Sequence, residues 1–205
     1  MSKKIVNHIA IILDRSGSMN KIREETISGF NEQLKSFRDN ANGQDNRVTL
    51  VTFGTTPDAP RFFTLDAELT EEDYIPRGWT ALYDAIGDTI TMLQAIEEEE
   101  NTDVAFLVTV ITDGQENHSK RFTQHKIATM IKELEDSGNW TFTYLGANHN
   151  VFEVSSALNF GAGNSKQFVL TVDGATCSNH ALVSSNIKYL SQRKAGRKQM
   201  KNFHG

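Results

Sequence analysis

The sequence contains little cysteine and no long apolar run. Its single cysteine, Cys177, excludes an intramolecular disulfide and a metal cluster held by cysteines alone, and it fits a reducing compartment. No stretch approaches the roughly 20 apolar residues that cross a bilayer. The apolar run that ends at Asp14 is too short for the core of a signal peptide. We therefore expect a cytoplasmic protein with no membrane segment.

An excess of basic residues is also missing. The formal net charge is -5 and the isoelectric point is about 5.7, which argues against a general polyanion-binding protein and makes a nucleic-acid partner unlikely. Only residues 193–205 are basic, and we expect them to form a frayed tail after a single domain at 1–192. A nucleic-acid accessory role would have to use this tail, whose cations are Arg193, Lys194, Arg197, Lys198 and Lys201.

Several segments have the composition of β-strands. Ile5–Leu13 and Val104–Thr112 are almost continuously apolar, which is typical of strands covered on both faces of a parallel sheet. Arg61–Leu65 is only half apolar and predicts a short edge strand. Further strands are expected at Arg47–Phe53, Trp140–Leu145 and Gln167–Val172.

Segments with helical periodicity alternate with these strands. They are Asn20–Arg38, Ala81–Ile96, Lys120–Ser137, Val151–Leu158 and Ala175–Gln192, with Gly138 ending the third and the acidic run Glu97–Glu100 at or beyond the end of the second. This alternation predicts a three-layer, doubly wound α/β fold. We expect about six strands in a mainly parallel central sheet, one short antiparallel edge strand, and helices on both faces.

Two predicted buried strands end at an aspartate, Asp14 and Asp113, and ligands of such sheets gather at the carboxyl ends of strands. In D-R-S-G-S-M, Ser16 and Ser18 follow Asp14 at every second position, so three oxygen-bearing side chains can converge. Carboxylate and hydroxyl oxygens suit a hard cation such as Mg²⁺, Mn²⁺ or Ca²⁺. Taken alone, the hexapeptide is better explained as a turn, because Asp, Ser and Gly are good turn formers.

Two distant segments make the pattern specific. Thr80 lies in G-W-T-A-L-Y-D-A-I just before a predicted helix, and Asp113 lies in T-D-G after the second buried strand. Asp14, Ser16, Ser18, Thr80 and Asp113, in this order, resemble the metal-ion-dependent adhesion site (MIDAS) of von Willebrand factor type A (vWA) domains. The resemblance extends over most of the chain and includes a Rossmann-like fold. Small stand-alone vWA proteins of bacteria and phages are similar in size.

The resemblance implies a role for each of these residues. The hydroxyls of Ser16, Ser18 and Thr80 would contact the metal, and Asp14 and Asp113 would act directly or through water. A partner's Asp or Glu, or a carboxylate of a second copy, would fill an open position. Two carboxylates nearly neutralise a divalent ion, so a third is acceptable electrostatically.

The residues expected to form a partner-binding rim are Arg15, Trp79, Glu116 and Asn117. Trp79 is a departure, because many relatives have glycine there, and we expect its ring to pack the loop rather than offer a stacking surface. Glu116 and Asn117 could instead support the ligands from behind. Asp84 and Asp88, on the next helix, are expected to be solvated or to face the helix N-terminus.

Together these features favour a non-enzymatic protein-binding module. The alternative is a metal-dependent phosphoester hydrolase, since an aspartate-rich site at strand ends also suits phosphoryl transfer. Against it, the sequence has no Asp-x-Asp nucleophile, no phosphate-binding loop of the G-x-x-x-x-G-K-[ST] type and no G-x-S-x-G elbow.

Overall fold

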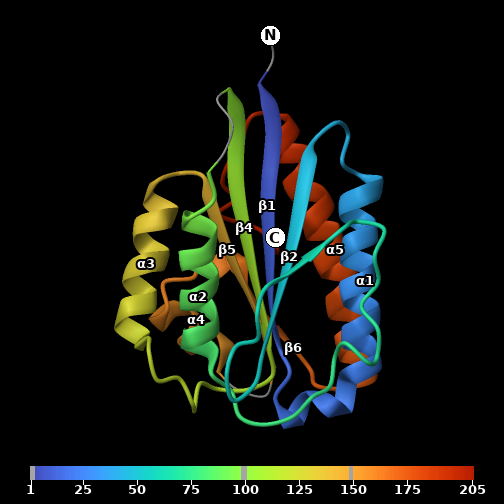
Figure 1. The fold of residues 1–205 in the computed structure, drawn as a ribbon, viewed down its shortest axis with the longest axis vertical. Coiled ribbons are helices and arrows are strands. Elements are labelled where there is room, and N and C mark those ends of the chain that lie inside the picture. Colours follow the sequence, from blue (N-terminus) through green and yellow to red (C-terminus); the bar gives the residue numbers. More distant parts are fainter. Residues whose placement is uncertain (1–2, 98–100, 148–149) are drawn as a thin grey trace.

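The computed structural model describes residues 3–97, 101–147 and 150–205. The chain forms a six-stranded sheet in the order β3-β2-β1-β4-β5-β6 (Figure 1). Its strands are β1 (Lys4–Asp14), β2 (Asp45–Phe53), β3 (Arg61–Phe63), β4 (Thr102–Thr112), β5 (Trp140–Ala147) and β6 (Ser165–Phe168). All neighbouring pairs are parallel except β2 and β3, which pair antiparallel at the edge. The predicted mixed sheet with one antiparallel edge strand is confirmed.

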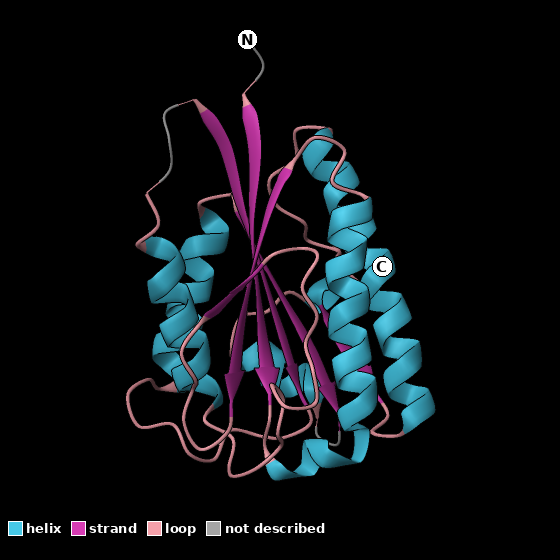
Figure 2. Cartoon of the chain, turned by 45° about the vertical axis from the view of Figure 1, so that its right-hand side comes forward, coloured by secondary structure: helices cyan, strands magenta, loops and turns pink. Residues whose placement is uncertain are grey.

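Helices cover both faces of the sheet, as predicted. They are α1 (Arg23–Asp39), α2 (Leu82–Gln94), α3 (Gln124–Asp136), α4 (Val151–Ala157) and α5 (Val172–Lys194), with 3₁₀ turns at Gly17–Ile22 and Ala162–Asn164. In Figure 1, α1 and α5 lie on the right of the sheet and α2, α3 and α4 on the left, and the turned view of Figure 2 separates the same layers. The result is a three-layer, doubly wound α/β fold.

Alternation along β1 explains why both faces are covered. Ile9 and Ile11 belong to the core with Phe30 of α1, whereas Ala10 and Ile12 belong to the core with Ile86 of α2. Successive side chains of a strand point to opposite faces, so an unbroken apolar run requires a helix layer on each side. This burial fixes where β1 ends and therefore where Asp14 emerges.

Two predicted boundaries are wrong for reasons visible in the loops. Helix α3 begins at Gln124 and not at Lys120, because Thr123 caps it by accepting a hydrogen bond from Lys126 N at 3.3 Å. Strand β6 ends at Phe168, short of the predicted Val172, because Thr171 caps α5 by accepting from Gly174 N at 3.1 Å. Side-chain capping at these positions overrides the local strand and helix propensities.

Two predictions about the ends of helices agree with the structure. Gly138 follows α3 with a positive φ of 82°, the left-handed conformation expected of the residue after a helix C-cap. Helix α2 ends at Gln94, so Glu97 lies beyond it, and Glu98 to Glu100 lie outside the described residues.

The expected frayed C-terminal tail is a wrong prediction. Arg193 belongs to α5 and is fully buried, and its guanidinium donates to Asn7 Oδ1 at 2.7 Å and to the carbonyl oxygen of Asp103 at 2.8 Å. Further on, Met200 and Phe203 are buried in the core on the α1 and α5 side. The segment 193–205 is therefore packed on the domain, because its apolar residues are spaced among the cations that suggested solvation.

Among the described residues, we find no helix with both the length and the apolar character needed to cross a membrane.

Candidate metal centre

Asp14 ends β1 and lies at the centre of the predicted site. Its side chain is fully buried, with Oδ1 accepting from Ser16 N at 2.6 Å and Oδ2 accepting from Thr112 Oγ1 at 2.6 Å. Burial raises the pKa of Asp14 from 3.8 to about 6, although the hydrogen bonds from Thr112 and Ser16 oppose the rise. The nearby carboxylate of Asp113 adds a smaller increase. A buried carboxylate of this kind is electrostatically unfavourable until a cation compensates it.

The two serines connect the Asp14 loop to the end of β4. Ser16 Oγ and Ser18 Oγ are 3.2 Å apart, and Ser18 Oγ donates to Asp113 Oδ1 at 2.8 Å. Strands β1 and β4 are neighbours, so Asp14 and Asp113 emerge at the same edge of the sheet. The strand order of the sheet reverses direction between β1 and β4, because the chain adds β2 beside β1 on one side and β5 beside β4 on the other. The carboxyl ends of these two strands therefore form the topological switch point, where ligands bind in such sheets.

Thr80 reaches the same place from the loop before α2. A Cβ built on Gly114 would lie 3.1 Å from Thr80 Oγ1 and 3.8 Å from Asp14 Oδ2, so these two oxygens flank one small space. The main chain of Thr80 is fixed at both ends by Asn117, whose side-chain oxygen accepts from Thr80 N at 2.9 Å and whose N–H donates to Thr80 O at 3.0 Å. Gly114 has no side chain, which leaves this space open.

Backbone contacts hold the three loops together. Gly17 N donates to Gly78 O at 3.2 Å, and Arg77 N donates to Arg15 O at 2.6 Å. The buried hydroxyl of Tyr74 donates to Asp14 O at 2.5 Å. The loop before Thr80 is thereby attached directly to the end of β1.

The donor set fits a hard divalent cation. It consists of two carboxylates and three hydroxyls, all oxygens, around a space that a single methyl group at Gly114 would crowd. Throughout the described residues, no three His, Cys, Asp or Glu side chains form a potential ligand group. A cation at this edge would therefore depend on the hydroxyls of Ser16, Ser18 and Thr80 as well as on Asp14 and Asp113.

The predicted rim residues have different surroundings. Arg15 donates from Nε and Nη2 to the two carboxylate oxygens of Asp58, at 2.5 and 2.7 Å. Glu116 accepts from Tyr83 N, His118 N and Ser119 N, so its carboxylate organises the loop and does not point to a partner. Together with Asn117, these side chains position the loops of the site.

The prediction made for the Trp79 ring is wrong. We expected its ring to pack the loop, but the residue is 62% exposed. The indole lies nearly parallel to the imidazole of His118, with ring centroids 6.5 Å apart and an interplanar angle of 10°. Because Thr80 must enter the site from the next position, Trp79 is turned outward, and an exposed stacked surface results.

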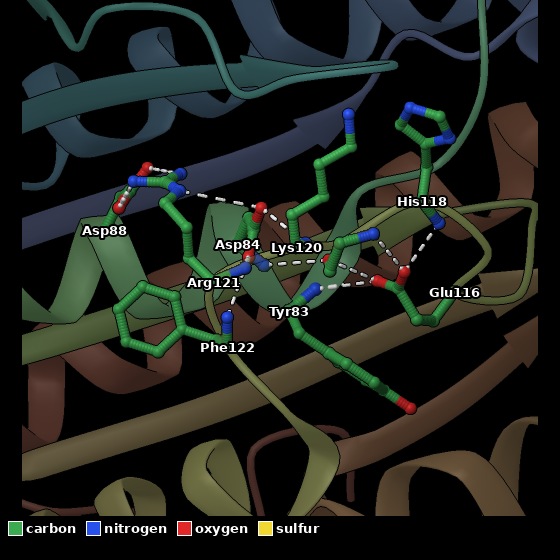
Figure 3. A network of polar contacts seen from close by, with 9 residues as sticks. Tyr83, Asp84, Asp88, Glu116, His118, Lys120, Arg121 and Phe122 are labelled. Atoms are coloured by element: carbon green, nitrogen blue, oxygen red, sulfur yellow. Dashed lines mark hydrogen bonds and ion pairs between the residues drawn. The ribbon is translucent and has the colours of Figure 1, made fainter.

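Asp84 is a supporting residue whose role the sequence did not show. Figure 3 places it between α2 and the loop after β4, where it accepts from the backbone N–H groups of Lys120, Arg121 and Phe122 at 2.9–3.0 Å. Burial opposes ionisation of this carboxyl, but the three donors outweigh it and hold its pKa below the usual value. Asp88, as expected, is at the surface and forms an ion pair with Arg121 at 2.5 Å.

Thr112 was also missed. Its hydroxyl fixes Asp14 and at the same time accepts from Gly114 N at 3.1 Å. The only sequence signal was its place directly before Asp113 in T-D-G.

No protein-family model matches the sequence, and no curated protein matches it. Solved structures do match in three dimensions. Proximal thread matrix protein 1 from the mussel byssus, with zinc occupying its MIDAS motif, has 18% identity and a TM-score of 0.56, over 90% of this chain and 46% of that chain. The ArnB paralogue VWA2 from Sulfolobus acidocaldarius has 14% identity and a TM-score of 0.56, over 90% and 45%.

A third match is the pilus adhesin SpaC from Lactobacillus rhamnosus GG in its open conformation. It has 13% identity and a TM-score of 0.61, over 91% of this chain and 31% of that chain. The chain thus spans less than half the length of each of these three proteins. At such identities the likeness shows the fold, which is that of vWA domains.

Proposed function

We propose that the chain is a metal-dependent protein-binding module that captures an acidic residue of a partner. The observation that carries the proposal is the convergence of Asp14, Ser16, Ser18, Thr80 and Asp113 from three separate loops onto one edge of the sheet. One turn-forming hexapeptide would not require Thr80 and Asp113 to lie beside it.

The electrostatics of the site support this role. Two carboxylates balance the charge of a divalent ion, and the bound ion would supply a Lewis-acidic position for one more carboxylate. The protein's own residues hold the ligand oxygens, and they leave the Ser18 hydroxyl at the exposed side of the site, since Ser18 is exposed while Ser16 and Asp14 are buried. A partner's Asp or Glu would approach from that side.

We propose Mg²⁺ as the natural ion, with Mn²⁺ or Ca²⁺ as alternatives, because every donor is an oxygen. The mussel protein with zinc in its MIDAS motif supports a divalent metal without choosing among them. Titration with each ion in turn distinguishes these choices.

The proposed role is binding and not catalysis. Hydroxyl ligands are poor general bases, and the two carboxylates already accept hydrogen bonds from Ser16, Thr112 and Ser18. The adhesin and matrix proteins among the structural matches support the same view.

We further propose a cytoplasmic location on the basis of the single cysteine. A carboxylate of a second copy of the chain is the alternative occupant of the open position on the metal.

The test is calorimetric titration of the metal-free protein with Mg²⁺ and Mn²⁺. We expect Ser18→Ala to weaken binding by about 10-fold or more and Asp14→Asn to abolish it, since the loss even of a residue that supports a metal ligand costs 10- to 100-fold. Asp136→Ala removes an exposed carboxylate on α3 and serves as the control. Unchanged affinity in both site variants would refute the assignment.

Partner capture needs its own measurement. Pull-down from the native host with and without EDTA identifies proteins held through the metal. Size-exclusion chromatography of the protein alone, under the same two conditions, tests for a second copy. An elution volume that changes with EDTA assigns the bound carboxylate to this chain.

A further inference from the structure

Several large hydrophobic side chains are exposed, and one of them lies directly before a proposed metal ligand. Among the large exposed hydrophobic residues, Trp79 precedes Thr80 directly, and Val169 and Val172 follow the end of β6. Phe62, by contrast, lies on the edge strand β3 and is 74% exposed. Trp79 is the member of this set that is adjacent in sequence to a proposed metal ligand.

The position of Trp79 is fixed by its neighbours. Gly78 O accepts from Gly17 N at 3.2 Å, and Trp79 N donates to Thr55 Oγ1 at 3.2 Å. The ring is stacked on the imidazole of His118, and the backbone N–H of His118 donates to Glu116 Oε1 at 2.7 Å. The two rings therefore form an aromatic surface that joins the Thr80 loop to the loop after Asp113, which are two of the three loops that supply the metal site.

Two cations lie close to these rings in the sequence, Arg77 two residues before Trp79 and Lys120 two residues after His118. Arg77 and Lys120 are both exposed, and neither side chain forms an ion pair with a residue that the structure describes. The charge of Arg77 reaches Asp58, but Arg15 already pairs with that carboxylate. Figure 3 shows Lys120 projecting to the same side of its loop as His118. In a protein of net charge -5, these cations make the rim locally attractive to acidic groups.

We propose that the partner segment is acidic and aromatic. It would place one carboxylate on the metal, an adjacent aromatic side chain on the Trp79 and His118 rings, and a second carboxylate near Arg77 and Lys120. This inference rests on the proposed function and specifies the partner's chemistry.

The charges near Trp79 favour an aromatic partner side chain over a cationic one. A partner Lys or Arg could stack on Trp79 through a cation–π contact, but Arg77 and Lys120 would repel it. An aromatic residue gains ring stacking without that repulsion, and tryptophan at an interface is a typical anchor. The flanking carboxylates of such a segment match the two cations.

The experiment uses two peptide probes and the Mg²⁺-loaded, ¹⁵N-labelled protein. One probe is acetyl-Gly-Phe-Glu-Glu-Gly-amide, and the other has Ala in place of Phe. The chain has two tryptophans, exposed Trp79 and buried Trp140, so the indole N–H signal that Trp79→Ala removes reports directly on this surface. We expect that signal to shift with the Phe peptide, which should bind about 3- to 10-fold tighter than the Ala peptide.

Three variants separate the contributions. Trp79→Ala should abolish the preference for Phe while leaving Mg²⁺ affinity unchanged, and Phe62→Ala, which removes a still more exposed aromatic ring elsewhere, should keep the preference. Lys120→Ala should weaken binding of both peptides about two- to fivefold at low salt. An unchanged affinity in Lys120→Ala would overturn the role of the second carboxylate.

The outcomes also separate this inference from the proposed function. If both peptides bind equally well and only in the presence of Mg²⁺, the aromatic preference is wrong while carboxylate capture stands. If neither peptide binds although Mg²⁺ does, carboxylate capture is wrong, and this inference is overturned with it.

Discussion

Replacing Asp14 with asparagine should remove metal binding and yet stabilise the metal-free protein. Asp14 is fully buried, and burial raises its pKa from 3.8 to about 6. At neutral pH, folding therefore transfers an ionised carboxylate into an environment that disfavours its charge. Asparagine has the same shape and no charge, so it behaves as a permanently protonated carboxyl.

The size of the effect follows from proton linkage. Between pH 3.8 and 6 the folded state binds the proton of Asp14 more tightly than the unfolded state, so the contribution of this group to stability falls as pH rises through that window. Above pH 7 the full cost is present, and it amounts to about 3 kcal/mol for about two pKa units. At pH 5 roughly half of this cost is still present, so the advantage of Asp14→Asn should shrink by roughly half between pH 8 and pH 5.

The hydrogen bonds around Asp14 can adapt to the amide. The asparagine oxygen can accept from Ser16 N, as Oδ1 does at 2.6 Å. Its NH₂ group needs an acceptor, and Thr112 Oγ1 can become one by turning its proton to Gly114 O, 3.1 Å away. Gly114 N continues to donate to the same hydroxyl oxygen. The existing donors keep their partners, while the second N–H of the amide gains no acceptor and subtracts from the relief of charge the cost of one unpaired donor, about 1 kcal/mol or more.

Urea denaturation in EDTA at pH 8 and pH 5 measures this effect, with Asp136→Asn as the exposed control. Added Mg²⁺ at 100 times its Kd should stabilise the wild type by about 2.7 kcal/mol and leave Asp14→Asn unchanged. If Asp14→Asn is less stable than the wild type in EDTA at pH 8, Asp14 is a structural residue and the reasoning from its buried charge is refuted.

Three further results are expected. Arg193→Ala should destabilise the protein by about 3 kcal/mol in urea denaturation, because it breaks a buried charged network, whereas Lys194→Ala should change little. Truncation after Lys194 removes buried Phe203 and should lower the thermal midpoint, and an unchanged midpoint would show that the C-terminal segment does not stabilise the core. Glu116→Gln should weaken Mg²⁺ binding about 10- to 100-fold in a folded protein, measured by calorimetry, since the amide cannot accept all the bonds that position Tyr83 and Ser119.

Most of the fold could be predicted because the two central strands are unusually clear in the sequence. The apolar runs of β1 and β4 have no polar face, which requires a parallel sheet with helices on both sides. Both runs end at an aspartate, so the carboxyl-end rule places Asp14 and Asp113 together. Thr80 needed the additional resemblance, because its loop crosses from β3 and has no strand of its own to locate it.

The features that could not be predicted depend on which residues a side chain contacts in the folded protein. Local charge suggested a solvated tail at 193–205. Arg193 instead donates to Asn7 and Asp103, at the end of the sheet opposite the candidate metal centre. Similarly, nothing near Trp79 in the sequence shows that Thr80 must turn inward and thereby expose the indole. Contacts between segments that are far apart in the sequence decide these cases, and periodicity does not report them.

The supporting residues explain how a site of this kind can be both ordered and open to a cation. Asp84 and Glu116 bind backbone N–H groups of the loop after β4 and the start of α2, and Asn117 fixes Thr80. The ligand oxygens are therefore positioned by contacts formed when the protein folds. What the metal-free site lacks is charge compensation for Asp14, not structure. Because the ordering is already complete, the free energy of metal binding can go to relieving that charge, and a variant that relieves it by other means gains stability only by losing the site.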